Sequence, residues 1–386
     1  MRIVAVNERT IPLSAASRNA SISFDAMTAS AIAIVTDASD GGKPLTGIGF
    51  DSVGRYGHGA LLRERVLPRL LAADPGDYAA GDAGIDPEKV GAVAMRNEKP
   101  GGHGERSGAI GLIDAAAFDL AAKRKGLPLW AYLAERYQRP AVNVIDIYAS
   151  GGHYRTDDDI GHLRADIHKA ITRGHRRFKI KIGGIALGED IRRIEAVLSM
   201  LEDGMTLAVD GNGTFSRDTA FAYAEALSGL PLAWIEEPVH PLDYDLHRDM
   251  AERFPSPIAT GENLFSADDA RNLLRYGGLR ADRDILQFDI SLSYGIVEYR
   301  RILDIMSDHG WSRAQCAPHA GHLLAFNVVA GFGLGCAETA IDENGLFGKL
   351  TSAVPVGDGR ATLSDRAGAG LETSPAFSEI FSGVLQ

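Results

Sequence analysis

Short hydrophobic runs that each end in an acidic residue recur through the middle of the chain, and they restrict its possible folds more than any other feature. The runs LAVDGNG, PLAWIEEP and PIATGEN place Asp210, Glu236 and Glu262 about 26 residues apart. This interval is the length of one strand, one helix and two loops. When such units are wound into a barrel, the carboxyl ends of all the parallel strands meet at one rim. The spacing therefore predicts three carboxylates on a single rim.

The order of strand-like and helix-like segments predicts an α/β barrel joined to a smaller α+β domain. After Pro140 the two kinds of segment alternate about eight times, which is typical of a parallel barrel. A doubly wound open sheet is the rival fold, but no glycine-rich nucleotide motif follows the first strand. Segments 2–7 and 31–38 indicate antiparallel strands, and helices are expected at about 58–73, at about 85–95 and in a long segment that ends near Gly126.

We therefore expect an α+β capping domain over residues 1–125, a barrel over residues 126–348, and a C-terminal segment over residues 349–386 that packs on the capping domain. The net charge of −11 argues against nucleic acid and against a basic membrane surface as partners. No apolar run approaches the roughly 20 residues of a membrane span, so a soluble cytoplasmic protein is expected. The two cysteines, Cys316 and Cys336, are expected to be buried free thiols.

The three strand-end acids indicate a divalent metal ion. Asp210, Glu236 and Glu262 must either repel one another or share a cation, and a site of carboxylate oxygens with open positions suits Mg²⁺. A single strand-end acid would more often be a helix cap or a solvated loop charge, but three in register favour the metal. Glu237 leaves the choice within its pair ambiguous, because only one of two adjacent strand residues can point inward. Asn212 could support the metal ligands by hydrogen bonds.

Two lysines in the run FKIKIGG indicate a catalytic base. Lys179 and Lys181 are two residues apart, so they lie on one face of a strand. A single lysine there would often be an edge residue that reaches solvent, but two on one face favour the rim of a site. A neighbouring cation and a metal would both lower the pKa of the lysine, which would permit a neutral base near pH 7.

Later strands supply a candidate acid. Asp289 and His319 end two neighbouring strands, and the carboxylate could orient the imidazole and raise its pKa. His322 lies where a helix should begin. Glu338 ends the last strand, and a salt bridge or cap is as plausible for it as contact with a substrate.

The order K-x-K, D-x-N, E, E and D…H along a barrel behind an α+β domain resembles the mandelate racemase branch of the enolase superfamily. The resemblance covers the whole chain. It implies a modified (β/α)7β barrel whose capping domain is completed by the C-terminal segment. It also implies a Mg²⁺ ion held by Asp210, Glu236 and Glu262, and a general base, Lys181, facing a His319–Asp289 pair. It places Lys179 by the substrate carboxylate and Glu338 by an enolate oxygen.

The same resemblance implies a small hydroxy-acid substrate, D-tartrate, which would lose water to give oxaloacetate. The second carboxylate of that substrate would need cations, and the candidates are Lys99, Arg55, Arg18 and Arg155. A dehydratase of a longer aldarate or aldonate, and a racemase or epimerase of a 2-hydroxy acid, are alternatives that use the same site. A non-catalytic metal-binding protein would need neither Lys181 nor the Asp289–His319 pair. A homo-oligomer is expected.

Overall fold

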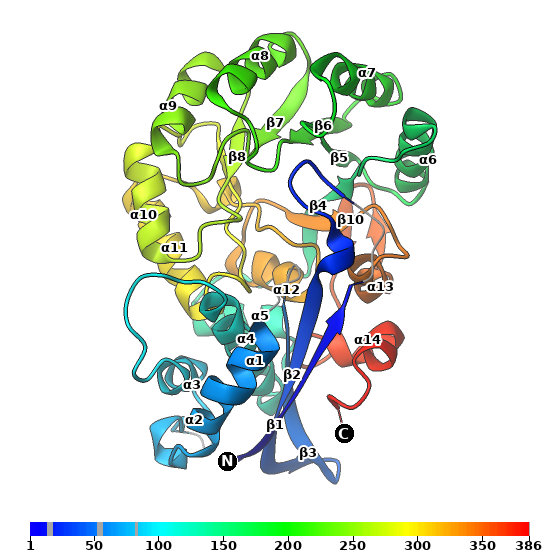
Figure 1. Ribbon diagram of the computed structural model, residues 1–386. Helices are drawn as coiled ribbons and strands as arrows, with labels where there is room; N and C mark the ends of the chain where they lie inside the picture. Colours follow the sequence, from blue (N-terminus) through cyan, green and yellow to red (C-terminus); the bar gives the residue numbers. More distant parts are fainter. Residues whose placement is uncertain (14–17, 52–56, 82–83, 386) are drawn as a thin grey trace.

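An antiparallel sheet with helices lies next to a ring of parallel strands surrounded by helices (Figure 1). The computed structural model describes residues 1–13, 18–51, 57–81 and 84–385. In the capping region, β1 (Ile3–Pro12), β2 (Thr28–Asp40) and β3 (Lys43–Phe50) pair antiparallel in that order. Its helices are α1 (His58–Leu61), a π-helical turn (Leu62–Val66), α2 (Leu67–Leu71), α3 (Pro87–Ala94) and α4 (Arg106–Arg124).

Helix α4 packs directly on β3 because β3 carries glycine where the two backbones meet. A Cβ atom on Gly47 or Gly49 would lie 2.1 Å from a backbone oxygen of α4, that of Ala116 or Leu112. Glycine is therefore required for this close approach. The helix is buried along almost its whole length, between β3 and the barrel.

The barrel follows the (β/α)7β order that the resemblance implied, except that the seventh unit has an irregular segment, bridged at Cys316, in place of a regular strand. Its strands are β4 (Val144–Gly151), β5 (Arg177–Lys181), β6 (Thr206–Asp210), β7 (Leu232–Glu236), β8 (Ile258–Thr260), β9 (Ile285–Leu286) and β10 (Ala337–Ala340). Its helices are α6 (Asp159–Thr172), α7 (Leu187–Leu198), α8 (Arg217–Leu227), α9 (Tyr244–Arg253), α10 (Ala267–Tyr276), α11 (Ile296–Asp308) and α12 (Leu323–Phe332). Strands β4 to β9 pair in order, and β10 pairs with the other side of β4. The predicted α/β barrel with a capping domain is therefore confirmed.

The ring closes through a segment that is less regular than the sequence pattern predicts. The run from Trp311 to His322 forms no continuous strand; only Cys316 bridges in parallel to Leu286 of β9. On the other side, the amide of Gly335, just before β10, donates to the carbonyl of Cys316. Beyond this bridge, the amides of Ala317 and His319 donate to the carbonyls of Leu286 and Gln287, so the segment stays beside β9 as far as His319.

The remaining elements connect the two regions. Helix α5 (Leu129–Arg136) packs on α12, and α13 (Leu346–Thr351) follows β10. Strands β11 (Val356–Gly357) and β12 (Arg360–Thr362) form a hairpin, and β12 pairs antiparallel with β4. Helix α14 (Pro375–Ile380) precedes a C-terminal tail that contacts β1, since Asn7 Nδ2 donates to the carbonyl of Val384 over 3.1 Å. Short 3-10 helices cover Phe24–Ala26, Pro75–Asp77, Arg313–Gln315 and Leu371–Thr373. We retain the division at 125/126 and 348/349 as a proposal.

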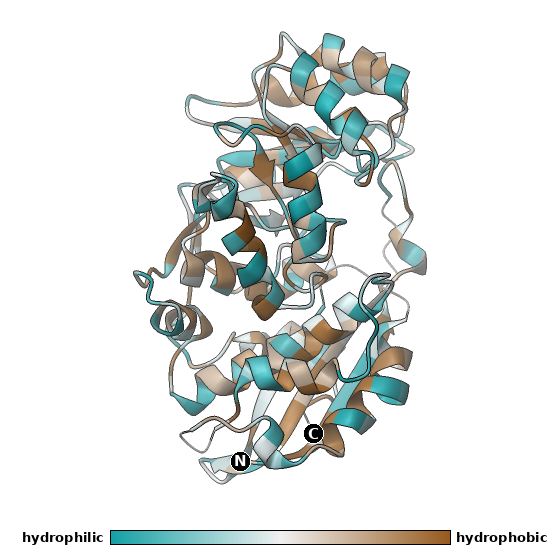
Figure 2. Cartoon of the chain, turned by 90° about the vertical axis from the view of Figure 1, so that its left-hand side faces the viewer, coloured by the Kyte–Doolittle hydropathy of each residue, from teal (hydrophilic) through white to brown (hydrophobic). Residues whose placement is uncertain are grey.

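Alternation along the barrel strands sorts side chains between two environments. Ile180 and Val209 belong to an apolar cluster with residues of the surrounding helices. Figure 2 shows that these helices carry both hydrophobic and hydrophilic residues. The residues that alternate with Ile180 and Val209 along each strand point inward, and the barrel interior combines small side chains with Tyr148 and Trp234.

Of the helices that the structure describes, none is long and apolar enough to cross a membrane.

Candidate active site

The acidic and basic strand ends meet at one rim of the barrel. Lys181, Asp210 and Glu236 are the last residues of β5, β6 and β7, and they pair side by side in the parallel ladders. Glu262 lies in the turn after β8, the next strand along the sheet. The sequence spacing thus brings these side chains together, since the strand ends of a parallel barrel share one face.

Both lysines point into the barrel and contact the acids. The Lys181 Nζ atom lies 2.6 Å from Asp210 Oδ2. Lys179 Nζ forms an ion pair with Glu236, lies 3.3 Å from Glu338 Oε1, and lies 5.4 Å from the centre of the Tyr148 ring. Lys179 is buried to 1% exposure, so these contacts provide the compensation that a buried charge requires.

The charge balance at Lys181 differs from the sequence expectation of a lowered pKa. Burial does lower the pKa, and so does the charge of Lys179, but the carboxylates of Asp210, Glu236 and Glu262 together hold the pKa of Lys181 above its ordinary value. The physical reason is distance, because Asp210 is in hydrogen-bond contact with the ammonium group.

Neighbouring donors hold the carboxylates of Asp210 and Glu236. Asn212 donates to Asp210 through its backbone amide (2.8 Å) and its side chain (3.2 Å), as a supporting residue should. Gln287 Nε2 and Trp234 Nε1 donate to Glu236 Oε2 over 2.6 and 3.1 Å. Sequence reasoning missed both of these donors. The signal was a period of two, because Trp234 precedes Glu236 by two residues and Gln287 precedes Asp289 by two.

His319 approaches the acids from another part of the ring. Its strand segment is separated from β5 by β10 and β4 on one side and by β6 to β9 on the other, so it lies across the barrel from Lys181. Its Nδ1 atom lies 2.8 Å from Asp289 Oδ2, and its Nε2 atom lies 3.6 Å from Glu262 Oε2. Burial lowers the pKa of His319, but the charge of Glu262 and the hydrogen bond to Asp289 raise it to about 10.

The second histidine of this segment has a different role. His322 is the N-cap of α12, where its Nδ1 atom accepts a hydrogen bond from the amide of Ala325, and burial lowers its pKa to about 4. Glu338 accepts a hydrogen bond from the amide of Ala320, and the charge of Lys179 contributes to lowering its pKa despite burial. Only His319 of the two histidines therefore faces the acids.

Glu237 joins the cluster as well, which the alternation rule did not predict. Strand β7 ends at Glu236, and a left-handed backbone at Glu237 (φ 35°) turns its side chain toward Asn263, whose Nδ2 donates to it over 2.8 Å. Its other oxygen has no hydrogen-bond partner among the described residues. Burial, and then the charge of Glu262, raise the pKa of Glu237 well above its ordinary value.

The donor set at the rim has the chemistry of a hard cation site. The cluster has six carboxylates, two ammonium groups and one imidazole: Asp210, Glu236, Glu237, Glu262, Asp289, Glu338, Lys179, Lys181 and His319. Burial, and then the charges of neighbouring acids, raise the pKa of Glu236 to about 8. In the part of the chain that the structure describes, no three acidic, histidine or cysteine side chains converge as metal ligands do, and Lys179 and Lys181 contact the acids. The excess of oxygen donors and the unpartnered oxygen of Glu237 nevertheless fit Mg²⁺.

Three of the four cations predicted for a second carboxylate are described by the structure, and none of the three contacts this cluster. Lys99, Arg18 and Arg155 are exposed, and the Arg155 guanidinium lies 3.6 Å from Asp166 of α6. Arg55 lies outside the described residues. These loop positions carry no periodic signal, so the sequence could not indicate which way their side chains point.

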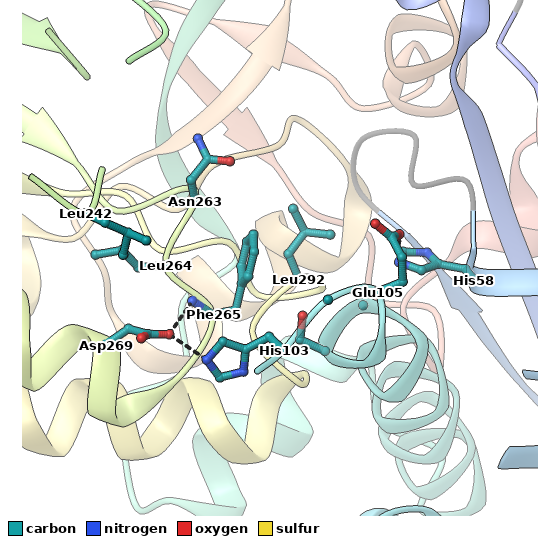
Figure 3. Close-up of a pocket in the computed structure, with 12 residues that line it drawn as sticks. His58, His103, Glu105, Leu242, Asn263, Leu264, Phe265, Asp269 and Leu292 are labelled. Atoms are coloured by element: carbon teal, nitrogen blue, oxygen red, sulfur yellow. Dashed lines mark hydrogen bonds and ion pairs between the residues drawn. The ribbon is translucent and has the colours of Figure 1, made fainter. Parts of the chain in front are cut away.

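A cavity of about 330 Å³ lies between the capping region and the rim (Figure 3). His58, His103 and Glu105 line it from the cap, and Asn263 and Asp269 line it from the barrel. Because Asn263 also contacts Glu237, the cavity adjoins the carboxylate cluster. None of the described residues that line it is a lysine or an arginine.

These features define a barrel enzyme with a capping domain, in which acid–base groups face one another across a carboxylate cluster. Residues 162–377 match the family model "Enolase C-terminal domain-like". The chain therefore belongs to the enolase superfamily, in its mandelate racemase and muconate lactonizing enzyme branch, as its motifs indicated.

Some relatives in this branch are acid-sugar dehydratases. The chain is 30% identical over 346 residues to L-talarate/galactarate dehydratase of Salmonella typhimurium, an alignment that covers 86% of this chain and 82% of the relative. It resembles the crystal structure of a racemase from Streptomyces coelicolor with bound magnesium (TM-score 0.76, 25% identity, 95% and 96% of the two chains covered). It also resembles L-talarate dehydratase of Polaromonas in complex with Mg and L-glucarate (TM-score 0.77, 26% identity, 95% and 92% covered).

Proposed function

We propose that this protein is a Mg²⁺-dependent acid-sugar dehydratase. The observation that carries the proposal is the position of Lys181 and of the His319–Asp289 pair on different sides of one carboxylate cluster. An amine and an imidazole placed in this way can remove a proton from one face of a substrate and protonate a leaving group on the other. Dehydratases among the relatives support the same reaction class.

The metal would be held by Asp210, Glu236 and Glu262, with Glu237 beside them. When bound, Mg²⁺ supplies positive charge that stabilises the negative charge developing on the substrate carboxylate. Lys179 would lie by the same carboxylate, and Glu338 would form a hydrogen bond with an oxygen of the enolate.

Lys181 would abstract the proton next to the carboxylate. This step requires the neutral amine, so the charge of Asp210, which raises the pKa of Lys181 here, must be offset in the working site. His319 has a pKa raised to about 10 and so carries its proton at neutral pH. It would donate that proton to the leaving hydroxyl, with Asp289 orienting the ring, and the enol that results would ketonise to a 2-keto acid.

D-tartrate, which would give oxaloacetate, is the specific substrate that we propose, on the strength of the motif order. A longer aldarate or aldonate is the second candidate. The cavity beside Asn263, and the talarate and galactarate activity of the relative, favour this second substrate.

The test is a panel of acid sugars, including D-tartrate, galactarate and arabinonate, assayed with Mg²⁺ for formation of 2-keto acid. Lys181→Met should abolish both the product and the exchange of the substrate α-proton in D₂O. His319→Asn should abolish the product while exchange continues. Inversion or exchange without keto acid in the unmodified enzyme would show a racemase instead, and near-normal turnover by either variant would refute the assigned roles.

A further inference from the structure

One buried carboxylate outside the cluster ties together the loops that follow β4 and β5. Asp190 of α7 is fully buried and accepts three hydrogen bonds. Its Oδ2 atom accepts from the backbone amide of Gly183 (2.6 Å) and from the hydroxyl of Tyr223 (2.7 Å), and its Oδ1 atom accepts from the hydroxyl of Tyr154 (3.0 Å).

Tyr154 extends the contact by one residue along the turn after β5. Its hydroxyl oxygen accepts a hydrogen bond from the amide of Gly184 over 2.9 Å. Asp190 and Tyr154 therefore hold two consecutive amides of the Gly183–Gly184 turn. Tyr223, from α8, donates to Asp190 and lies close to the amide of Gly183, whereas the amide of Gly184 bonds to Tyr154.

The turn is confined by packing as well as by hydrogen bonds. Gly183 has a left-handed backbone (φ 89°), and a Cβ atom there would lie 2.4 Å from the ring of Phe215. A Cβ atom on Gly184 would lie 2.3 Å from the ring of Tyr154. The side chains of Phe215 and Tyr223 stack with 4.3 Å between ring centres. These contacts restrict the backbone position of both glycines.

Lys181 is the last residue of β5 and stands two residues before Gly183. A lysine side chain has four rotatable bonds, so the place of its ammonium group depends on where its backbone is held. On the other side of the network, Tyr154 follows the end of β4, where Arg193 of α7 donates to the carbonyl of Gly152 over 2.7 Å. The network therefore fixes the end of β5 relative to its neighbour β4.

We infer that Asp190, together with Tyr154, is a positioning residue that holds Lys181 in place for proton abstraction. The inference rests on the proposed function of Lys181. Neither residue need touch the substrate. Displacement of a reacting group by about 1 Å can cost about 100-fold in rate, so a turn released by one hydrogen bond should be visible in kcat.

The experiment compares Tyr154→Phe with Tyr223→Phe. Each variant removes one hydroxyl that bonds to Asp190 and keeps the ring, but only Tyr154→Phe also frees the amide of Gly184. We expect Tyr154→Phe to lower kcat about 10- to 100-fold, with KM within about twofold, and to raise the primary isotope effect for a substrate deuterated at the α-carbon. Tyr223→Phe should stay within about threefold of the unmodified enzyme, although both variants lose similar thermal stability.

A second readout does not need turnover. Hydrogen exchange followed by mass spectrometry on peptides covering residues 182–186 should show faster exchange in Tyr154→Phe than in Tyr223→Phe, and faster still in Asp190→Asn. Equal kcat values and equal exchange in the two tyrosine variants would overturn the inference. If the unmodified enzyme dehydrated no acid sugar, the proposed function would be refuted. Equal hydrogen exchange of this peptide in the two tyrosine variants would separately refute the role of Tyr154 in holding the Gly183–Gly184 turn.

Discussion

At the scale of single residues, the site is a set of buried charges whose protonation depends on contacts of a few ångströms. Asp289 is fully buried, and its Oδ1 atom accepts the amide of Leu292 over 2.8 Å while its Oδ2 atom meets His319. The carboxylate is thereby fixed on one side by the backbone and fixes the imidazole on the other. Its charge and its geometry both serve to keep His319 protonated and oriented.

Replacing Asp289 by asparagine should therefore impair the acid step. Asp289→Asn keeps the shape but removes the charge and presents either an amide or an oxygen to Nδ1. We expect kcat for keto acid formation to fall about 10²- to 10⁴-fold, the range that general acid catalysis contributes. Asp282→Asn, at an exposed position, is the matched control, and steady-state assays of both variants decide the matter. Equal kcat values for the two variants would exclude a role for Asp289.

A buried histidine outside the site should make stability depend on pH. His247 of α9 is fully buried, neither ring nitrogen has a hydrogen-bond partner among the described residues, and burial lowers its pKa to about 4. The unfolded chain, with a histidine pKa of about 6.5, therefore binds one more proton than the folded chain between these two values. The contribution of His247 to stability is complete above pH 6.5 and is lost, at about 1.4 kcal/mol per pH unit, as the pH falls toward 4.

His247→Leu should remove this part of the pH dependence. Urea unfolding at pH 7, 6 and 5 should show a shallower loss of the free energy of unfolding in the variant than in the unmodified protein. His168→Leu, at an exposed position on α6, should leave the slope as it is, since water surrounds that side chain before and after unfolding. Parallel slopes for the unmodified protein and His247→Leu would contradict the assignment.

At the scale of elements, α4 joins the cap to the rim of the site. The Asp114 carboxylate accepts the amides of Ile296 and Val297 at the start of α11, so a residue of the cap stabilises the N-terminus of a barrel helix. One turn earlier, a Cβ atom on Gly111 would lie 1.8 Å from the carbonyl oxygen of Ser291, two residues after Asp289. The helix backbone thus rests on the loop that carries the orienting carboxylate.

Adding a methyl group at this contact should separate the helix from the loop. Gly111→Ala should lower the free energy of unfolding by about 1–3 kcal/mol, because backbone atoms cannot yield as side chains do. Gly91→Ala on α3 is the matched control, since a Cβ atom there meets nothing within 4 Å, and it should stabilise the protein by up to about 1 kcal/mol. Chemical denaturation measures the free energy of unfolding of both variants. A Gly111→Ala protein as stable as Gly91→Ala would show that a methyl group can be accommodated between α4 and Ser291.

At the scale of the whole molecule, the proposed metal site at the rim would couple cation binding to the stability of the barrel. Asp210, Glu236 and Glu262 come from three successive strand–helix units, so an ion that binds all three must favour the closed ring over the unfolded chain. A homo-oligomer, which the sequence suggested, stays a prediction.

Mg²⁺ should therefore raise the melting temperature of the unmodified protein. At 100 times its Kd, the ion should add about 2.7 kcal/mol to the free energy of unfolding. Asp210→Ala should lose most of this stabilisation, whereas Glu202→Gln, at an exposed acid outside the rim, should keep it. Thermal melts with Mg²⁺ and with EDTA test the prediction. An unchanged Mg²⁺ response in Asp210→Ala would remove that residue from the metal site.

The sequence by itself determined the barrel, the capping domain and the strand-end residues that meet at the rim. It could do so because alternation decides which face of a strand a residue takes, and because the length of each strand–helix unit decides where the next strand ends. Lys179, Lys181, Asp210 and Glu236 are brought together by these two local rules alone. His319 and Asp289 followed for the same reason, although their strands are short or irregular.

Only the tertiary structure decided which residues support that rim. Gln287 and Trp234 bond to Glu236, and Glu237 turns into the cluster, because of packing inside the closed ring. The sequence could not decide whether exposed cations such as Lys99 and Arg155 bind a substrate. Nor could it single out the carboxylate of Asp190, because no periodic signal distinguishes this residue from the other acids of its helix. Hydrogen bonds between distant segments depend on where the closed chain places them, and a local pattern in the sequence contains no such information.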